Sequence, residues 1–172
     1  MARVTLITGG NLGDVKSRLR TAQRMINDKV GIVLRCSHRY KSRPWGFSSD
    51  DEFSNQVLEV DTDLSADEVL DAVQAIEREL GRDREEETRL KAETGAHYSS
   101  RMIDIDVLFY DELVIESPRL TIPHPLIEER DFVLAPLCEL MKGRKHPVSG
   151  KTMEELRAEL LSKHESEVIG NE

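Results

Sequence analysis

The apolar positions of the chain switch between the two-residue period of a strand and the three-to-four-residue period of a helix. The most apolar, β-branched stretch is 101–109, which predicts a buried central strand. Upstream of it the same patterns predict, in chain order, a strand at 4–8, a helix over 15–26, strands at 32–40 and 53–60, and a helix over 66–80. The element order is therefore β-α-β-β-α-β.

Local signals support the helix ends. Asp14 is a candidate N-cap of the first helix, Ser65 and Glu68 form a capping-box pattern at the start of the second, and Gly81 follows its last turn. The β-α-β-β-α-β order is that of the ferredoxin-like α+β fold, an antiparallel sheet with two helices on one face. We expect that fold here.

A C-terminal extension follows the central strand. Its pattern predicts a hairpin at 110–115, short helices at 126–130 and 132–140, and a last amphipathic helix at 152–161. We expect one domain over 1–163 and a frayed tail over 164–172.

The central strand carries two carboxylates, Asp104 and Asp106. Because strand side chains alternate, the two share a face about 6–7 Å apart. Ile103, Ile105 and Val107 then point to the opposite face. Two like charges on a buried strand favour a bridging divalent cation. A sheet face open to water, with both carboxylates solvated, is the alternative interpretation.

Composition narrows the classes of partner. The chain has 172 residues and a formal net charge of −9, so a nucleic-acid backbone is not an expected partner. An anionic substrate would need a local basic site or a metal. No signal peptide or apolar stretch of membrane-spanning length is visible. Cys36 and Cys138 do not have a zinc or C-x-x-C spacing, and we expect a cytoplasmic protein.

Three loops carry candidate chemistry. The glycine-rich turn 9–14 is either a phosphate cradle or a plain tight turn. Trp45 lies in a Pro/Gly-containing loop, where it either covers a flat ligand or packs on the sheet. The polar connection 82–100 is long enough to be a functional lid, with Arg82 and Arg101 at its ends.

Five motifs, in order, resemble those of 6-hydroxymethyl-7,8-dihydropterin pyrophosphokinases, a family of folate-biosynthesis enzymes. They are residues 9–14, Phe53-Ser54-Asn55, Gly81-Arg82-x-Arg84, the stretch from Arg101 to Leu108, and residues 119–125. The resemblance covers roughly residues 4–140. It implies transfer of pyrophosphate from ATP to the hydroxymethyl group of the dihydropterin, with release of AMP. We expect a monomer without a nucleic-acid or membrane partner.

The resemblance also implies a set of site residues. Asp104 and Asp106 would hold two Mg²⁺ ions, and Arg82 and Arg101 would act on the phosphates. The expected pterin-binding residues are Ser42, Arg43, Pro44, Trp45, Phe53, Asn55, Tyr98, Asp104 and Phe132. The expected ATP-binding residues are Gln74, Glu77, Arg84, Arg101, Val107, Arg119, Leu120, Thr121, His124 and Arg130.

The segment 82–100 departs from the family pattern. Ser99 and Ser100 stand where the family usually has Gly-Pro, and Tyr98 stands where it commonly has Trp. The segment is also longer than usual and rich in glutamate at 85–87. We expect weaker or slower loop closure, without loss of activity. Two other classes remain open: a phosphotransferase with a non-pterin acceptor, and a ferredoxin-like module that binds a ligand without catalysis.

Overall fold

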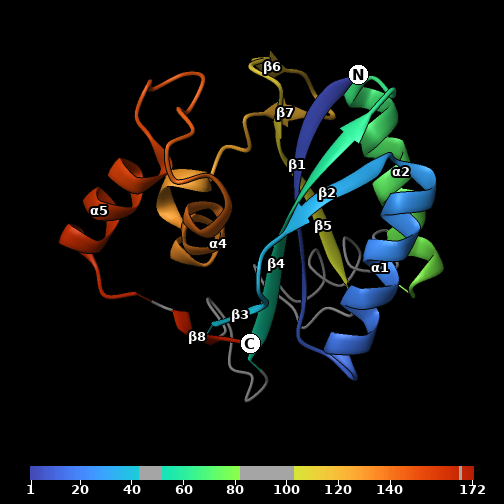
Figure 1. The fold of residues 1–172 in the computed structure, drawn as a ribbon, viewed down its shortest axis with the longest axis horizontal. Helices are drawn as coiled ribbons and strands as arrows, with labels where there is room; N and C mark the ends of the chain where they lie inside the picture. Colours follow the sequence, from blue (N-terminus) through green and yellow to red (C-terminus); the bar gives the residue numbers. More distant parts are fainter. Residues whose placement is uncertain (43–51, 82–102, 167) are drawn as a thin grey trace.

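The computed structural model describes residues 1–42, 52–81, 103–166 and 168–172. Within these ranges the centre of the molecule is a six-stranded sheet in which every neighbouring pair is antiparallel (Figure 1). Its strands are β1 (Ala2–Gly10), β2 (Ile32–Cys36), β3 (Tyr40–Ser42), β4 (Phe53–Thr62), β5 (Asp104–Tyr110) and β8 (Val168–Asn171).

The strand order confirms the ferredoxin-like prediction. The order is β5-β1-β4-β3-β8, with β2 also paired to β4, so β1 and β4 lie at the centre. The first helix joins β1 to β2, and the second joins β4 to β5. That is the arrangement expected from the β-α-β-β-α-β order.

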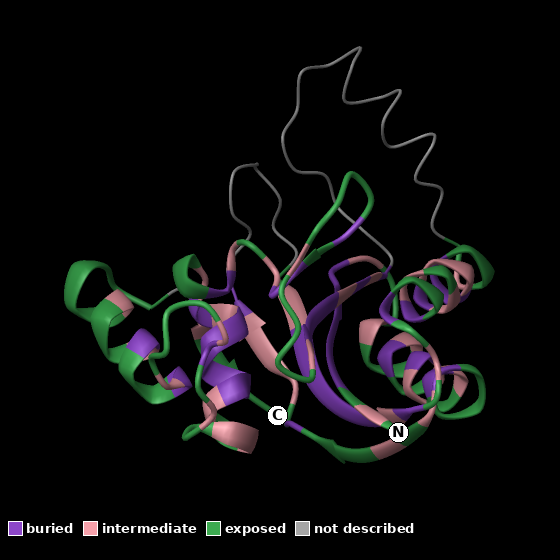
Figure 2. Cartoon of the chain, turned by 90° about the horizontal axis from the view of Figure 1, so that it is seen from above, coloured by how far each residue is buried: buried purple, intermediate pink, exposed green. Residues whose placement is uncertain are grey.

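Helices cover both faces of this sheet (Figures 1 and 2). Helices α1 (Val15–Lys29) and α2 (Ala66–Glu79) lie on one face, over a core that includes Ile105 and Val107 of the central strand. Helices α4 (Asp131–Met141) and α5 (Met153–Lys163) belong to the C-terminal extension and lie on the other face, with Leu108 in their core. The sheet therefore separates two hydrophobic cores.

The predicted helix ends are confirmed. The Asp14 side chain accepts a hydrogen bond from the backbone N–H of Ser17, and Ser65 and Glu68 form the reciprocal capping box. Gly81 has a φ of +99°, the left-handed conformation that a glycine after a helix supplies without strain. In the described part of the chain, no helix has the length and apolarity needed to cross a bilayer.

The strand predicted over 32–40 is interrupted. β2 ends at Cys36 and β3 begins at Tyr40, with Ser37 buried between them. The Ser37 hydroxyl donates to the His38 carbonyl at 2.7 Å and accepts from the Val57 N–H at 3.0 Å. These side-chain hydrogen bonds, one of them to β4, replace part of the strand ladder, which the alternation of apolar residues could not reveal.

Two predictions for the C-terminal extension are wrong. Residues 110–115 do not form a closed hairpin: Asp111 turns the chain at φ +48°, and β6 (Ile115–Glu116) pairs with β7 (Thr121–Ile122) instead. The tail is not frayed, because β8 pairs with β3 over Tyr40–Ser42. A short 3₁₀ helix, Ile127–Glu129, precedes α4.

Candidate active site

A pocket opens on the α4 face of the sheet, where β1, β4 and β5 meet the start of α4. It has about 720 Å³ of space not filled by protein atoms, including the part open to solvent. The residues that line it are Ile7, Thr8, Gly9, Ser42, Phe53, Asn55, Asp104, Asp106, Leu108, His124, Arg130, Phe132 and Val133.

The floor of the pocket is one row of residues across three strands. Gly9 of β1 pairs with Asn55 of β4 on one side and with Asp104 of β5 on the other. Two strand spacings separate Asn55 from Asp104, about 9–10 Å. A Cβ on Gly9 would lie 2.3 Å from the Asn55 Oδ1 atom, so only glycine leaves this row open.

Asn55 brings an unusual donor to this floor. The residue is 8% exposed, and its amide Nδ2 atom is buried without a hydrogen-bond partner among the described residues. An unpaired buried donor costs about 1–3 kcal/mol. A ligand with an acceptor at this position would remove that cost.

The carboxylate pair lies as the sequence predicts. Asp104 and Asp106 line the pocket, whereas Ile105 between them is buried in the α1/α2 core. The Ile105 N–H donates to the Glu77 carboxylate of α2 at 2.9 Å. Glu77 is 1% exposed, so this buried hydrogen bond fixes the backbone between the two aspartates.

His124 closes one side of the pocket. Its backbone N–H donates to the Leu108 carbonyl at 3.0 Å, which ties the segment after β7 to β5. Its Nδ1 accepts from the Leu126 N–H at 3.2 Å, so the neutral ring carries its proton on Nε2, which lies 3.9 Å from the Asp106 Oδ2. Burial lowers the pKa of the imidazole, Arg130 lowers it further, and Asp104 opposes both.

Two aromatic rings stand at the pocket wall. Phe53 comes from the first residue of β4, opposite Ser42 of β3, and Phe132 comes from the first turn of α4. The Arg130 guanidinium lies 5.5 Å from the centre of the Phe132 ring. Aromatic faces suit a planar ligand, and a guanidinium beside them suits an anion.

The structure brings together eight of the residues expected from sequence. They are Ser42, Phe53, Asn55, Asp104, Asp106, His124, Arg130 and Phe132. Seven other expected residues lie outside the described part of the chain. They are Arg43, Pro44, Trp45, Arg82, Arg84, Tyr98 and Arg101.

Six further candidates for ATP binding are described but are not among the residues that line this pocket. They are Gln74, Glu77, Val107, Arg119, Leu120 and Thr121. Val107 and Leu120 belong to the α1/α2 core. Arg119 pairs with Asp71 on the surface of α2. Their roles toward a nucleotide stay predictions.

Sequence reasoning missed five lining residues, namely Ile7, Thr8, Gly9, Leu108 and Val133. Gly9 was considered only as part of a possible phosphate turn, although it lies inside β1. Its position at the end of a β-branched run was the available signal, since glycine inside a strand often marks a close approach of another group. The other four are apolar or strand residues without a chemical signature.

The two aspartates suit Mg²⁺. No group of three or more His, Cys, Asp or Glu side chains gathers in a metal-binding arrangement within the described ranges. Mg²⁺ is commonly held by one or two carboxylates together with substrate phosphates and water, so a pair is sufficient. A closed structural zinc site would need more protein ligands.

The pocket combines a carboxylate pair, a histidine and two aromatic rings, and this combination suits a phosphotransferase with a planar acceptor. The comparison with known families makes this specific. Residues 5–142 match the sequence model of the 7,8-dihydro-6-hydroxymethylpterin-pyrophosphokinase family. The chain belongs to this family.

Individual relatives agree with that assignment. A 2-amino-4-hydroxy-6-hydroxymethyldihydropteridine pyrophosphokinase of Porphyromonas gingivalis is 40% identical over 141 residues, which cover 81% of this chain and 91% of the relative. The enzyme of the same name from Aquifex aeolicus is 35% identical over 159 residues, covering 92% of each chain.

A solved structure supports the fold. Plasmodium falciparum HPPK-DHPS, crystallised with pteroate, superposes with a TM-score of 0.75 at 14% sequence identity. The superposition covers 94% of this chain but only 45% of that chain, so this chain spans less than half of the Plasmodium protein.

Proposed function

We propose that this chain transfers pyrophosphate from ATP to the hydroxymethyl group of 6-hydroxymethyl-7,8-dihydropterin, releasing AMP, as a step of folate biosynthesis. Family membership supports the reaction. The observation that carries the proposal is the row Asn55–Gly9–Asp104. It places a buried amide donor and a carboxylate that could bind a metal ion at the two ends of the same pocket floor. Asn55, at one end of that floor, would bind the polar edge of the ring, and Asp104, at the other end, would lie on the phosphate side.

The acceptor would be held by stacking and by one directed hydrogen bond. Phe53 and Phe132 offer ring faces to the flat pterin, and the Asn55 amide N–H donates to an acceptor on its edge. Ser42, expected beside them, lies next to Phe53 in the β3–β4 pairing. This anchoring would place the hydroxymethyl oxygen toward Asp104.

The phosphate side would be organised around β5. Asp104 and Asp106 are the residues that would hold Mg²⁺, two ions in our proposal, and the metal would neutralise phosphate charge during an in-line displacement. The neutral His124 keeps its Nε2–H directed toward this region, and Arg130 adds a cation at the wall. Such transfer depends on positioning and charge more than on covalent catalysis.

The remaining roles rest on the resemblance. We propose that Arg82 and Arg101, outside the described residues, meet the phosphates as charge develops. We also propose a monomeric enzyme. Cys36 and Cys138 are both free thiols, which supports a reducing, cytoplasmic setting.

The test is AMP release from ATP and Mg²⁺, with and without the dihydropterin, on the wild type, on Asp104→Asn and on Glu116→Gln. Glu116 is an exposed carboxylate of β6 outside the pocket, so its variant is the matched control. We expect pterin-dependent AMP that Asp104→Asn lowers by about three orders of magnitude and Glu116→Gln leaves unchanged.

Other products would overturn the proposal in distinct ways. ADP in place of AMP would show that the chain is a γ-phosphoryl kinase that uses the same two aspartates of β5. AMP formation that does not need the pterin would point to a different acceptor. Ligand binding without turnover would favour a non-catalytic module.

A further inference from the structure

The start of α4 is held by the C-terminal extension. Asp131 is the first residue of α4, lies between the pocket residues Arg130 and Phe132, and is 4% exposed. Its Oδ1 accepts from the Arg157 Nε of α5 at 2.9 Å. Its Oδ2 accepts from the Ser166 hydroxyl, so both carboxylate oxygens are bound by residues far along the chain.

The same tail is tied to the opposite wall of the pocket. The Ser166 hydroxyl also accepts from the Val168 N–H at 3.1 Å, at the point where β8 begins. Val168 pairs with Ser42, which lines the pocket from β3. The Tyr40 hydroxyl donates to Glu139 of α4 at 2.7 Å, so β3 and α4 are joined a second time.

The buried charge of Asp131 is compensated by its partners. A buried carboxylate without a partner is costly, and Arg157 with Ser166 supplies the partners that Asp131 needs. The Asp131 side chain also lies in the first turn of α4, where a negative charge interacts favourably with the helix N-terminus. The pair raises the pKa of Arg157, mainly through its hydrogen bond to Asp131.

We propose that Asp131 is a positioning residue for the substrate pocket, and that Arg157 and Ser166 hold it so that Phe132 and Arg130 keep their places in the pocket wall. The C-terminal strand thereby belongs to the scaffold of the site. The kinetic consequence rests on the proposed function, whereas the structural consequence does not.

The structural test is hydrogen exchange at the first turn of α4. The Val133 and Leu134 amides donate to the Arg130 carbonyl, both at 3.0 Å, so their protection reports this turn. In Arg157→Met we expect exchange at these two amides to rise about tenfold while β1 and β4 keep their protection. Unchanged exchange at Val133 and Leu134, or an equal rise throughout the chain, would overturn the proposal whatever reaction the protein catalyses.

The kinetic test is the separation of KM from kcat. Arg157→Met is expected to raise the KM for the dihydropterin about tenfold, because Phe132 is displaced, and to lower kcat by a smaller factor, because Asp104 and Asp106 of β5 stay in place. Arg157→Lys, which keeps the charge, should recover part of the loss. A lower kcat at unchanged KM would mean that Arg157 affects only the folded fraction, and the proposal would be wrong.

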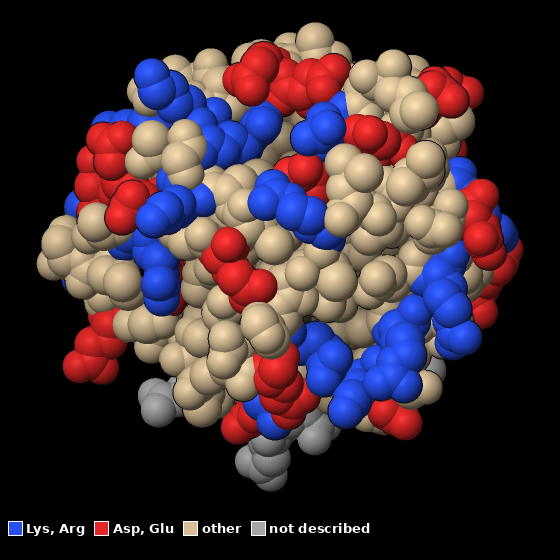
Figure 3. Space-filling model, viewed as in Figure 1, with Lys and Arg blue, Asp and Glu red and all other residues tan. Residues whose placement is uncertain are grey.

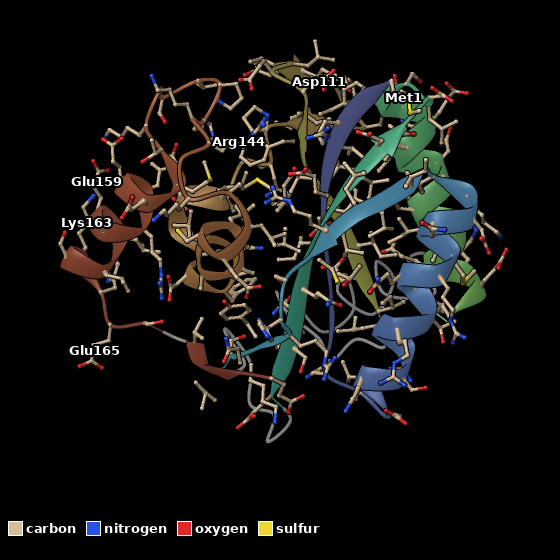
Figure 4. The ribbon with its side chains drawn as sticks, viewed as in Figure 1. Met1, Asp111, Arg144, Glu159, Lys163 and Glu165 are labelled. Atoms are coloured by element: carbon tan, nitrogen blue, oxygen red, sulfur yellow. The ribbon has the colours of Figure 1, made fainter. Side chains whose placement is uncertain are left out.

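Two further variants complete the design. Ser166→Ala removes one hydrogen bond and should shift exchange and KM in the same direction by a smaller factor, which keeps the test decisive if Arg157→Met folds poorly. Lys151→Met is the matched control, since it breaks a surface pair with Glu159, which lies on the outer side of α5 (Figure 4). It should change neither quantity; a change as large as that of Arg157→Met would overturn the proposal.

Discussion

At the scale of single residues, the lack of a side chain at Gly9 keeps the pocket floor open. The Asn55 carboxamide occupies the space that any Cβ on Gly9 would enter, and the contact would be 2.3 Å. The neighbouring strands hold Asn55 by the ladder, so the side chain rather than the backbone has to move.

We therefore expect Gly9→Ala to weaken dihydropterin binding at least about tenfold, because the displaced amide loses its hydrogen bond to the ring. Titration with the pterin alone measures this. Gly143→Ala is the control, since nothing lies within 4 Å of a Cβ built there. Equal affinities of the wild type and Gly9→Ala would show that Asn55 does not contact the ligand.

The positions of the two aspartates on β5 could be predicted because alternation is a local property. Asp104 and Asp106 share a face in any strand of this register, and apolar neighbours fix which face is buried. Asn55 was expected in the site, but its unpaired amide could not be foreseen, because pairing depends on neighbours from other strands. The Val107 side chain is in the α1/α2 core, and its expected role toward ATP stays a prediction.

At the scale of elements, a buried hydrogen bond from the Ile105 N–H to the Glu77 carboxylate joins β5 to α2. Nothing in the sequence around Glu77 indicated this role. Among the described residues β5 is the edge strand of the sheet, and this hydrogen bond satisfies an N–H on its outer edge.

Two substitutions of Glu77 distinguish the effect of its charge from the effect of its hydrogen bond. Glu77→Gln keeps an acceptor for Ile105, whereas Glu77→Leu keeps the volume and loses the acceptor. We expect Glu77→Leu to raise the Mg²⁺ concentration for half-maximal activity several-fold more than Glu77→Gln does, because the aspartates are then less well fixed. The same metal dependence in both variants would assign the role of Glu77 to its charge.

Elements that depend on pairing with residues distant in the chain could not be predicted from the sequence. The caps at Asp14 and Ser65 were found because each uses residues three apart. β8 was not found, because a short polar tail forms a strand only where β3 offers a free edge. The break at Ser37 escaped for the same reason, since its partners Val57 and Gln56 come from β4.

At the scale of the whole molecule, the formal net charge is −9. On the face drawn in Figure 3, acidic and basic groups are interspersed. The buried His146 makes stability depend on pH. His146 is 6% exposed, and its Nδ1 accepts from the N–H groups of Val148 and Ser149 at 3.2 and 3.3 Å. Burial is the main cause that lowers its pKa, Arg144 lowers it too, and Glu128 opposes them.

A depressed histidine pKa fixes the sign of the pH dependence. The unfolded chain binds a proton at His146 near pH 6.5, while the folded chain resists it, so the stabilisation is complete above that pH and is lost as pH falls toward the folded pKa. We expect the urea midpoint to fall between pH 7 and pH 5.5, and to fall less in His146→Asn. Parallel curves for the two proteins would mean that other groups cause the acid sensitivity.

The unpaired Asn55 amide has a consequence for inhibitor chemistry. A compound that fills the pocket but presents a C–H opposite Nδ2 leaves that donor desolvated, whereas the matching aza or carbonyl compound satisfies it. Matched pairs of this kind should differ about ten- to a hundredfold in affinity at nearly equal size and lipophilicity. The position of one nitrogen in a bicyclic scaffold would then govern selectivity more than added bulk does.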